Sequence, residues 1–510
     1  MSESIARVAS GHSETTRAAS QVLEAGGNAV DALIAAAWAA CAAEPVLCSP
    51  GGGGHALLRL RGRAPVVADF FTQTPSVRRI DGLDFYPIHG NFGADVQEFH
   101  VGMGSVAVPG MVAGLFALHQ RHASMPMTAL VQPAVALARD GVELNAVQAE
   151  ALRILEPIVR TDDDSARLFG LDSAESPLPE RGRRIRNGPL ADFLQLTARD
   201  GAERFYHGEV AARIAAMSQD HGGHLSLSDL QRYRVRWRRP MHWCLDARTR
   251  LWSNPPPAFG GLMVALMTRA LVLRLAPNTT FGSAAHLDAL VDAMRVSQDQ
   301  RGELERPDYL SSSRMLMEAF RQLARDHALT ARGTTHVSIR DAAGNLAGMT
   351  LSNGEGCGRV VSGCGFMLNN MLGEQDLNRL GFHNWPRNRR LSSMMAPTLV
   401  EHAGRRIMLG SGGSNRIRTA IAQVLCNVMH FGMGLQEAVD APRLHLEGHA
   451  LAVEFGGCGW REGMDGWLDD GYSDARRWPG RSLYFGGAHA VADDDQAADP
   501  RRQGAAWHSG

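Results

Sequence analysis

The sequence predicts an α/β protein from its composition and from two kinds of segment. Of its 510 residues, 45% are hydrophobic and 21% are charged, which is typical of a globular chain with ample core. Residues 333–341 alternate apolar and polar side chains as a half-buried strand does. Residues 15–25 and 28–41 carry apolar side chains at helical spacing. The length allows two or more domains, or one large α/β sandwich.

The first segments of the chain predict two helices in succession. Residues 15–25 form the first helix, and Gly26 and Gly27 close it. Asn28 can cap the second helix, in which apolar residues recur at helical spacing from Val30 to Cys41. The alanine-rich surface of this second helix predicts that it is buried against a sheet.

Four glycines, Gly51 to Gly54, follow these helices. A phosphate-binding loop is one interpretation, but the run lacks both a following Lys-Ser/Thr pair and the G-x-G-x-x-G register. We therefore expect the run to pack closely against the strand at 333–341. His55 is expected to begin a strand rather than to bind a ligand, and Val66 to Phe71 predicts a buried strand.

The rest of the chain predicts helices joined by strands and turns. The expected segments are a strand entering a turn at 106–110, a helix at 130–141, a polar loop at 176–187, helices at 200–208 and 225–233, a helical tail at 307–332, an exposed link at 331–333 and a closing strand pair at 483–491. Asp493 to Asp495 predicts a surface turn, because no EF-hand spacing follows these aspartates.

The charge of the chain excludes several classes of function. The formal net charge is −1, and no block of like charges favours nucleic acid or a membrane surface. All 52 basic residues are arginine, so a lysine Schiff base and a P-loop lysine are both excluded. The α-amino groups are then the only amines expected to titrate near neutrality, at about 7.7–8.0.

The cysteines and the N-terminus predict a cytoplasmic protein without a metal. Seven cysteines show neither a C-x-x-C pair nor zinc-finger spacing, which favours free thiols in a reducing compartment over a disulfide framework. Residues 1–20 lack the apolar core of a signal peptide, and no later stretch is long enough to span a bilayer.

Short motifs recur in a fixed order over nearly the whole chain. They are Glu24 to Ala32, Glu44-Pro45, Gly51 to Gly54, Asn254 to Pro257, Gly260-Gly261, Thr334 to Asp341, Leu368 to Asn370, Leu391 to Met394, Pro397-Thr398, Gly410 to Gly413, Ala441 to Arg443 and Asp499 to Arg501. Together they resemble the motifs of the γ-glutamyltransferase family. The resemblance implies a four-layer αββα sandwich of the N-terminal-nucleophile hydrolase type, with no metal or organic cofactor.

In that family an internal threonine cuts its own preceding peptide bond and becomes an N-terminal nucleophile. The resemblance places this threonine at Thr334 and the scissile bond after Gly333, whose missing Cβ leaves the carbonyl open to attack. Cleavage would give a large fragment, 1–333, and a small fragment, 334–510. The expected assembly is a heterodimer of these two fragments, with a higher oligomer also possible.

The resemblance also implies the groups that assist the nucleophile. Ser352 stands where the family has a second hydroxyl bound to the new terminal amine. Gly412 and Gly413 match the loop whose amides bind the oxyanion, and the register one residue on, Gly413-Ser414, fits almost as well. An isolated glycine run is more often a turn.

The substrate-binding positions match the family only in part. Relatives hold the glutamate α-carboxylate with an arginine in a D-F-R context, whereas here Asp69-Phe70 is followed by Phe71. The hydroxyl pair for the same carboxylate is retained as Ser392 and Ser393. The α-amino partners correspond to Asn353 and Glu374, and a glutamine or glutamate nearby has become Met371.

A buried carboxylate without a guanidinium partner is costly. Either Arg389, Arg390 or Arg416 substitutes for the missing arginine, or the substrate is not a standard γ-glutamyl compound. Phe71 itself is expected to pack in the core.

Three hypotheses follow. The first is γ-glutamyl transfer or hydrolysis, with a γ-glutamyl amide such as glutathione as substrate and water or an amine as acceptor. The second is an amidohydrolase for a different small-molecule amide, resembling cephalosporin acylase or oxamate amidohydrolase. The third is an unprocessed, non-catalytic relative that keeps the fold.

Overall fold

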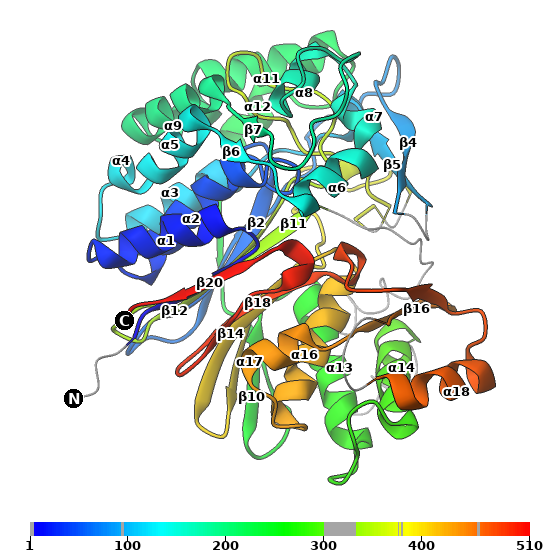
Figure 1. Ribbon diagram of the computed structural model, residues 1–510. Helices are drawn as coiled ribbons and strands as arrows, with labels where there is room; N and C mark the ends of the chain where they lie inside the picture. Colours follow the sequence, from blue (N-terminus) through cyan, green and yellow to red (C-terminus); the bar gives the residue numbers. More distant parts are fainter. Residues whose placement is uncertain (1–4, 93–95, 300–332, 376, 379–380, 456–459) are drawn as a thin grey trace.

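The computed structural model describes residues 5–92, 96–299, 333–375, 377–378, 381–455 and 460–510. Two antiparallel sheets lie at the centre of the molecule, and helices cover the outer face of each (Figure 1). The order of the layers is helix, sheet, sheet, helix. The four-layer αββα sandwich predicted from the sequence is therefore confirmed.

The first sheet has seven strands. In spatial order they are β20 (Ala505–His508), β1 (Arg7–Ser10), β11 (Thr334–Arg340), β12 (Leu346–Ser352), β2 (Gly53–Arg59), β3 (Val66–Phe70) and β8 (Arg236–Arg238). Each strand pairs antiparallel with its neighbours. Strand β11, which begins with Thr334, is thus an inner strand between β1 and β12.

The second sheet has six strands. In spatial order they are β19 (Gln496–Ala497), β18 (Gly487–Ala492), β14 (Arg405–Gly412), β13 (Thr398–His402), β10 (Thr249–Ser253) and β9 (Met241–Cys244). These pairs are also antiparallel. Both sheets therefore contain strands from either side of residue 333.

A small apolar cluster joins the facing surfaces of the two sheets. Leu57 and Leu346 of the first sheet pack in one buried cluster with Leu399, Met408 and Val491 of the second. Side chains alternate between the two faces of a strand, so the opposite faces remain available to the helices.

Helices α1 (Ser13–Glu24) and α2 (Ala29–Ala43) cover the first sheet (Figure 1). Asn28 caps α2: its side chain accepts hydrogen bonds from the backbone N–H groups of Val30 and Asp31, and the Asp31 carboxylate in turn accepts one from the Asn28 N–H. This reciprocal cap starts the helix where the sequence predicts. Residues 30–41 are all buried, because alanines let α2 approach the sheet closely.

Other helices complete both outer layers. Near the first sheet are α3 (Met111–His122), α4 (Met127–Leu130), α5 (Gln132–Asp140), α6 (Ala146–Ile154), α7 (Glu156–Val159), α8 (Asp163–Leu168), α9 (Gly188–Asp200), α10 (Glu203–Tyr206), α11 (Glu209–Asp220) and α12 (Leu227–Arg232). Near the second are α13 (Gly260–Arg274), α14 (Ala284–Asp299), α16 (Arg416–Met429), α17 (Leu435–Asp440) and α18 (Arg461–Gly471).

Short strands and turns supply the remaining elements. They are β4 (Tyr86–Asn91), β5 (Val96–Val101), β6 (Val142–Glu143), β7 (Arg184–Ile185), β15 (Leu444–Glu447), β16 (Ala450–Glu454) and β17 (Arg476–Trp478), with 3₁₀ helices at Met103–Ser105, Met371–Gly373, Leu483–Phe485 and Pro500–Arg502.

Most of the predicted elements are confirmed, and five require correction. Residues 106–110 form an isolated bridge between Val108 and Gln73 rather than a strand. The loop at 176–187 contains the two-residue β7, and the helices at 200–208 and 225–233 are shorter than expected. Residues 483–491 form a 3₁₀ helix followed by β18 instead of two strands. The predicted tail, 307–332, lies outside the described residues.

The glycine run packs one strand away from its expected position. A Cβ on Gly52 would lie 2.3 Å from the Ser352 oxygen, and one on Gly54 would lie 2.5 Å from the Thr350 oxygen. Both contacts are with β12 and not with β11, because β1 occupies the other edge of β11. His55 is the third residue of β2 and not the first.

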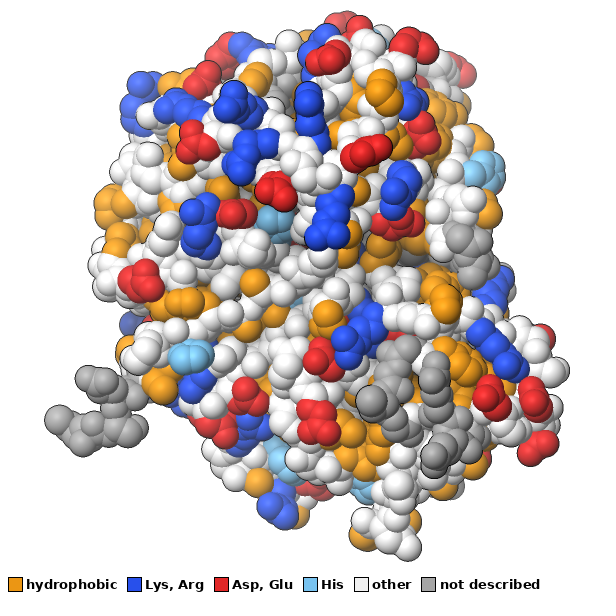
Figure 2. Space-filling model, in the orientation of Figure 1, with side chains coloured by type: hydrophobic (Ala, Val, Ile, Leu, Met, Phe, Trp, Pro, Cys, Tyr) orange, Lys and Arg blue, Asp and Glu red, His pale blue; other side chains and the backbone are white. Residues whose placement is uncertain are grey.

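The six cysteines that the structure describes are free thiols. Within the described ranges, no helix has the length and apolarity needed to cross a bilayer, and no group of His, Cys, Asp and Glu side chains is arranged to hold a metal ion. Acidic and basic side chains are interspersed over the upper part of the face in Figure 2. That face therefore has no large area of one charge.

Candidate active site

Thr334 begins β11 and is 4% exposed. It pairs with Ser352, the last residue of β12, across the β11–β12 ladder. Gly333, before it, is held tightly: a Cβ there would lie 2.4 Å from the Gly354 oxygen and 2.8 Å from the Val46 oxygen. Only glycine fits this position without displacing backbone, which agrees with its predicted place at the scissile bond.

Ser352 contacts the predicted scissile bond directly. Its Oγ donates a hydrogen bond to the carbonyl oxygen of Gly333 at 2.6 Å and accepts one from the Gly354 N–H at 3.0 Å. The hydroxyl is thereby oriented, because its acceptor site is filled and its proton points at the Gly333 oxygen. The predicted partner of Ser352 is the terminal amine; in the uncut chain its partner is the carbonyl that precedes that amine.

A buried carboxylate supports the strand beside the threonine. Glu44, just after α2, accepts hydrogen bonds from Thr335 Oγ1 at 2.7 Å and from Thr15 Oγ1 at 2.8 Å. It is fully buried. Glu44 thus ties β11 to both α1 and the end of α2. The Glu44-Pro45 motif is visible in the sequence, but no local pattern predicts that Glu44 bridges these elements.

The glycine loop at the end of β14 lies against the same strand end. A Cβ on Gly412 would fall 2.1 Å from the carbonyl oxygen of Thr334. Gly413 has φ +109° and Ser414 has φ +51°, so the chain turns sharply here through conformations that favour glycine. The assignment of this loop as the oxyanion site stays a prediction, and its position beside Thr334 permits that role.

Asn353 and Glu374 belong to a buried polar cluster next to Gly333. Both are less than 5% exposed. Gly354 joins them: its carbonyl faces Gly333, and a Cβ on it would lie 2.0 Å from Asn370 Oδ1 and 2.4 Å from Glu374 Oε1. The structure therefore places the two predicted amino-group partners close to the predicted nucleophile.

The predicted hydroxyl pair has main-chain partners. Ser392 Oγ donates to the Leu377 oxygen at 3.4 Å, and Ser393 Oγ accepts from the Met395 N–H at 3.0 Å. Ser393 is buried, whereas Ser392 is partly exposed. Both hydroxyls are therefore engaged by the protein, and their predicted role toward a substrate carboxylate remains a prediction.

Phe71 is in the core, as predicted. It is 1% exposed and belongs to one apolar cluster with Met371, Leu372, Trp385 and Leu391. Phe71 and Met371 are the two positions where the family resemblance implies polar groups for the substrate. The structure brings these two apolar replacements together, so the region is packed as hydrophobic core.

The three arginines considered as substitutes are differently placed. Arg390 Nε pairs with Asp69 Oδ1 at 3.2 Å, its guanidinium lies 4.7 Å from the Tyr233 ring centre, and it also donates to the carbonyl oxygen of Phe71. Arg416 is buried with its guanidinium 4.0 Å from the Tyr484 ring centre. Arg389 is exposed. Of the three, Arg390 therefore already has its guanidinium engaged by Asp69, the Tyr233 ring and the Phe71 carbonyl.

The electrostatics around Asp69 hold Arg390 in place. Burial alone would raise the pKa of Asp69, but His55, Arg390 and Arg238 act in the opposite direction and hold that pKa below its usual value. Arg238 Nε donates to Asp69 Oδ2 at 2.7 Å. Asp69 therefore stays charged and retains both arginines.

His336 lies two residues along β11 from Thr334, but it is bound elsewhere. Its Nδ1 is 2.8 Å from Thr350 Oγ1, and its Nε2 is 2.9 Å from Ser338 Oγ. Burial lowers the pKa of His336 well below its usual value. Since both ring nitrogens have hydroxyl partners, His336 is a structural residue, and a base for Thr334 must come from elsewhere, such as a freed α-amine.

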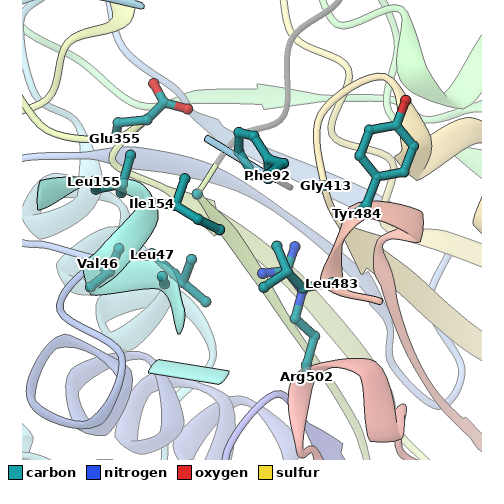
Figure 3. A pocket seen from close by; sticks show the side chains of 12 residues that line it. Val46, Leu47, Phe92, Ile154, Leu155, Glu355, Gly413, Leu483, Tyr484 and Arg502 are labelled. Carbon is teal, nitrogen blue, oxygen red and sulfur yellow. The ribbon is translucent and has the colours of Figure 1, made fainter. Parts of the chain in front are cut away.

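A cavity of about 40 Å³ opens beside these groups (Figure 3). It is lined by Val46, Leu47, Phe92, Ala151, Ile154, Leu155, Gly333, Glu355, Gly413, Leu483, Tyr484 and Arg502. Because Gly333 and Gly413 are among its lining residues, the cavity lies next to the predicted scissile bond and the glycine loop. The combination supports acyl transfer: a buried hydroxyl, an oriented carbonyl, a glycine loop and an adjacent space for a small group.

Comparison with known proteins supports this interpretation. The sequence profile of the gamma-glutamyltranspeptidase family matches residues 15–508. A glutathione hydrolase proenzyme of Pseudomonas aeruginosa is 30% identical over 463 residues, which cover 84% of this chain and 80% of that protein. An acylase ACY 1 proenzyme of Pseudomonas sp. (strain V22) is 28% identical over 475 residues, which cover 88% and 83%.

The fold also matches a solved structure. The crystal structure of cephalosporin acylase from Bacillus halodurans superimposes with a TM-score of 0.78 and 22% sequence identity, covering 99% of this chain and 96% of that one. The match extends through all four layers, since it spans nearly the whole of both chains.

Proposed function

The chain belongs to the gamma-glutamyltranspeptidase family, and from that premise we propose that it is an amide hydrolase or acyl transferase whose nucleophile is Thr334. The nucleophile is released when the chain cuts its own bond after Gly333. The observation that carries the proposal is the 2.6 Å hydrogen bond from Ser352 Oγ to the Gly333 carbonyl. This hydrogen bond polarises the carbonyl of the peptide bond between Gly333 and Thr334. Because Gly333 has no Cβ, its side of that carbonyl is open to attack by the Thr334 hydroxyl.

Cleavage proceeds by an N→O acyl shift. Thr334 Oγ1 attacks the carbonyl carbon of Gly333, the C–N bond breaks, and the proton lost by the hydroxyl ends on the new amine. Water then hydrolyses the Gly333 ester. This leaves a carboxylate on Gly333 and a free α-amine on Thr334, the base that a threonine nucleophile requires.

The mature site repeats the same chemistry on a substrate. The Thr334 amine takes the hydroxyl proton as Oγ1 attacks the substrate amide, and amides of the Gly412–Ser414 loop stabilise the oxyanion. One such donor contributes roughly 3–4 kcal/mol to transition-state stabilisation. The leaving amine takes a proton, and water or a second amine releases the acyl group from Thr334.

The apolar cluster at Phe71 and Met371 favours a substrate other than a standard γ-glutamyl compound. Position 71 offers no arginine to an α-carboxylate, and the neighbouring Arg390 is already paired with Asp69. The space around Phe71 is filled by aromatic and aliphatic side chains. Two similar proteins are named as acylases and not as glutathione hydrolases, which supports a substrate of another kind. We therefore propose a different small amide as the preferred substrate and a γ-glutamyl compound as the alternative. The retained residues Glu374, Ser392 and Ser393 favour the alternative.

The test is a comparison of chain length in three proteins. Wild type is expected to give fragments of 333 and 177 residues, with the smaller beginning Thr-Thr-His-Val. Thr334→Ala is expected to remain one chain of 55.1 kDa, and Thr334→Ser to be cut, since it keeps a hydroxyl. Normal cleavage of Thr334→Ala would refute the nucleophile, and a permanently uncut wild type would support a non-catalytic relative.

A further inference from the structure

The cavity beside Gly333 is apolar on most of its surface (Figure 3). Val46, Leu47, Ile154 and Leu155 form one side of it, and Leu483 belongs to another. Its volume of about 40 Å³ holds only a few water-sized groups, because about 10–15 Å³ on this measure accommodates one water. The space therefore suits a short group with a few heavy atoms.

Arg502 is the basic residue of this wall. Its side chain rises from the C-terminal segment into the space among the labelled side chains (Figure 3). It is 6% exposed, and among the described residues its Nε has no hydrogen-bond partner. A buried guanidinium without a directly paired carboxylate is costly, so this position favours an anionic ligand.

The carboxylates that act on Arg502 are committed to other groups. Burial lowers the pKa of Arg502, while Asp499 and Glu44 act in the opposite direction. Asp499 pairs with Arg443 Nη2 at 2.7 Å and with Arg501 Nη1 at 3.2 Å. Glu44 accepts from two threonine hydroxyls. Neither acid therefore neutralises Arg502 as a direct partner.

The fold presets the position of this guanidinium. Arg502 is the last residue of the 3₁₀ helix Pro500–Arg502. The residue before it, Arg501, is held by a hydrogen bond from its Nε to Glu454 Oε1 at 2.9 Å and by an ion pair with Asp499. Gly487 lets the side chain pass, since a Cβ there would lie 2.1 Å from Arg502 Cγ. A Cβ on Gly412 would lie 2.1 Å from the Thr334 oxygen and 3.6 Å from Arg502 Nη2. The guanidinium thus lies next to the reaction centre.

We propose that this cavity binds the free carboxylate of a short dicarboxylic acid monoamide, with Arg502 as its counter-ion. The proposal rests on the proposed function, because the amide end of the same molecule is the group that Thr334 attacks. Guanidinium and carboxylate form paired, charge-assisted hydrogen bonds. The small volume limits the acyl chain to a few carbons, and the apolar wall packs against its methylenes.

Glu355 adds a second restriction on which acyl groups the cavity accepts. It also lines the cavity, and its Oε2 accepts a hydrogen bond from Asn370 Nδ2 at 3.1 Å. A carboxylate branching from the middle of the acyl chain would approach Glu355 and be repelled. We therefore expect an unbranched chain, with its free carboxylate toward Arg502 and its other end, the amide or the carboxylate that hydrolysis leaves, at Thr334.

Calorimetric titration of the purified enzyme with succinate tests the proposal without any need for turnover. Succinate is the acid that hydrolysis of the four-carbon monoamide would release, and neutral succinamide is the matched ligand. Wild type is expected to bind succinate more tightly than succinamide. Arg502→Met is expected to weaken succinate binding by roughly tenfold to a hundredfold and to leave succinamide unchanged.

Two further variants control this measurement. Arg502→Lys keeps the charge without the planar fork and is expected to bind succinate with intermediate affinity. Arg248→Met removes an equal charge from an exposed turn and is expected to bind as wild type does. Circular dichroism establishes that each variant is folded.

The results separate failure of this proposal from failure of the proposed function. Equal succinate affinity in wild type and Arg502→Met overturns the carboxylate site, as does the absence of measurable binding to wild type. An enzyme that stays uncut and hydrolyses no amide overturns the proposed function. In that case the succinate titration still decides the role of Arg502.

Discussion

Replacing Phe71 by arginine restores the residue that the family resemblance implies, and we expect this change to destabilise the protein. Phe71 is 1% exposed and packs with Met371, Leu372 and Trp385. Loss of its burial costs about 1.5–3 kcal/mol, and an unpaired buried guanidinium adds several more. The expected loss of unfolding free energy is therefore about 4 kcal/mol or more.

Asp69 cannot offset this cost. Its Oδ2 accepts from Arg238 and its Oδ1 pairs with Arg390, so both carboxylate oxygens already have cationic partners. A new arginine at position 71 would compete with Arg390 instead of filling an empty place. We expect no gain in γ-glutamyl turnover from this single substitution.

The assay is urea unfolding followed by tryptophan fluorescence. It is run in the uncut Thr334→Ala background, so that one chain unfolds. Ile80→Arg is the matched control, because Ile80 is 84% exposed and surface changes usually stay within about 0.5 kcal/mol. If Phe71→Arg unfolds at the same urea concentration as its parent and gains γ-glutamyl turnover when Thr334 is restored, the packed-cluster reasoning is wrong.

Three other expectations follow from the contacts near Thr334. Ser352→Ala removes the hydrogen bond to the Gly333 carbonyl and should slow self-cleavage about tenfold or more. Gel densitometry over time measures the cleavage rate, and a rate equal to that of wild type would contradict the role of Ser352. Glu44→Ala leaves two buried threonine hydroxyls unpaired and should cost about 2–5 kcal/mol in urea unfolding, against little change for Glu44→Gln. Burial lowers the pKa of His55 from 6.5 to about 4, so unfolding takes up a proton between these values. Stability should therefore fall as pH drops from 6.5 to 4, by about 3 kcal/mol for this group, and His55→Gln should flatten the fall; a pH-independent urea midpoint over that range would refute it.

Local signals in the sequence were sufficient for most elements of the fold. Asn28, the alanine-rich run after it and the closing Gly26-Gly27 predicted α1 and α2 nearly to the residue, because caps and periodicity act over a few residues. The error at 106–110 has the opposite origin. That run is apolar because it is buried beside Asn369, which bonds to the backbone of Ala107, and burial alone does not make a strand.

The candidate site was predictable only where the residues lie on paired strands. Thr334 and Ser352 are joined by one turn of chain, so their pairing follows from a hairpin. Glu44 reaches Thr335 across 291 residues, and Arg502 approaches Gly412 from the C-terminal segment. No local pattern marks such contacts. The sequence likewise showed changes at Phe71 and Met371, but not that these side chains share one cluster.

The strand order of the first sheet has a consequence for how the two fragments would stay together. Strand β1 of the large fragment lies between β11 and β20 of the small one, hydrogen-bonded to each. If the chain is cut after Gly333, the two fragments would therefore be interleaved in one sheet, and separating them would require opening the ladders on both sides of β1. A small fragment expressed alone would lack β1 between β11 and β20 and would also lack β2 beside β12. The strand edges left unpaired would be prone to aggregation.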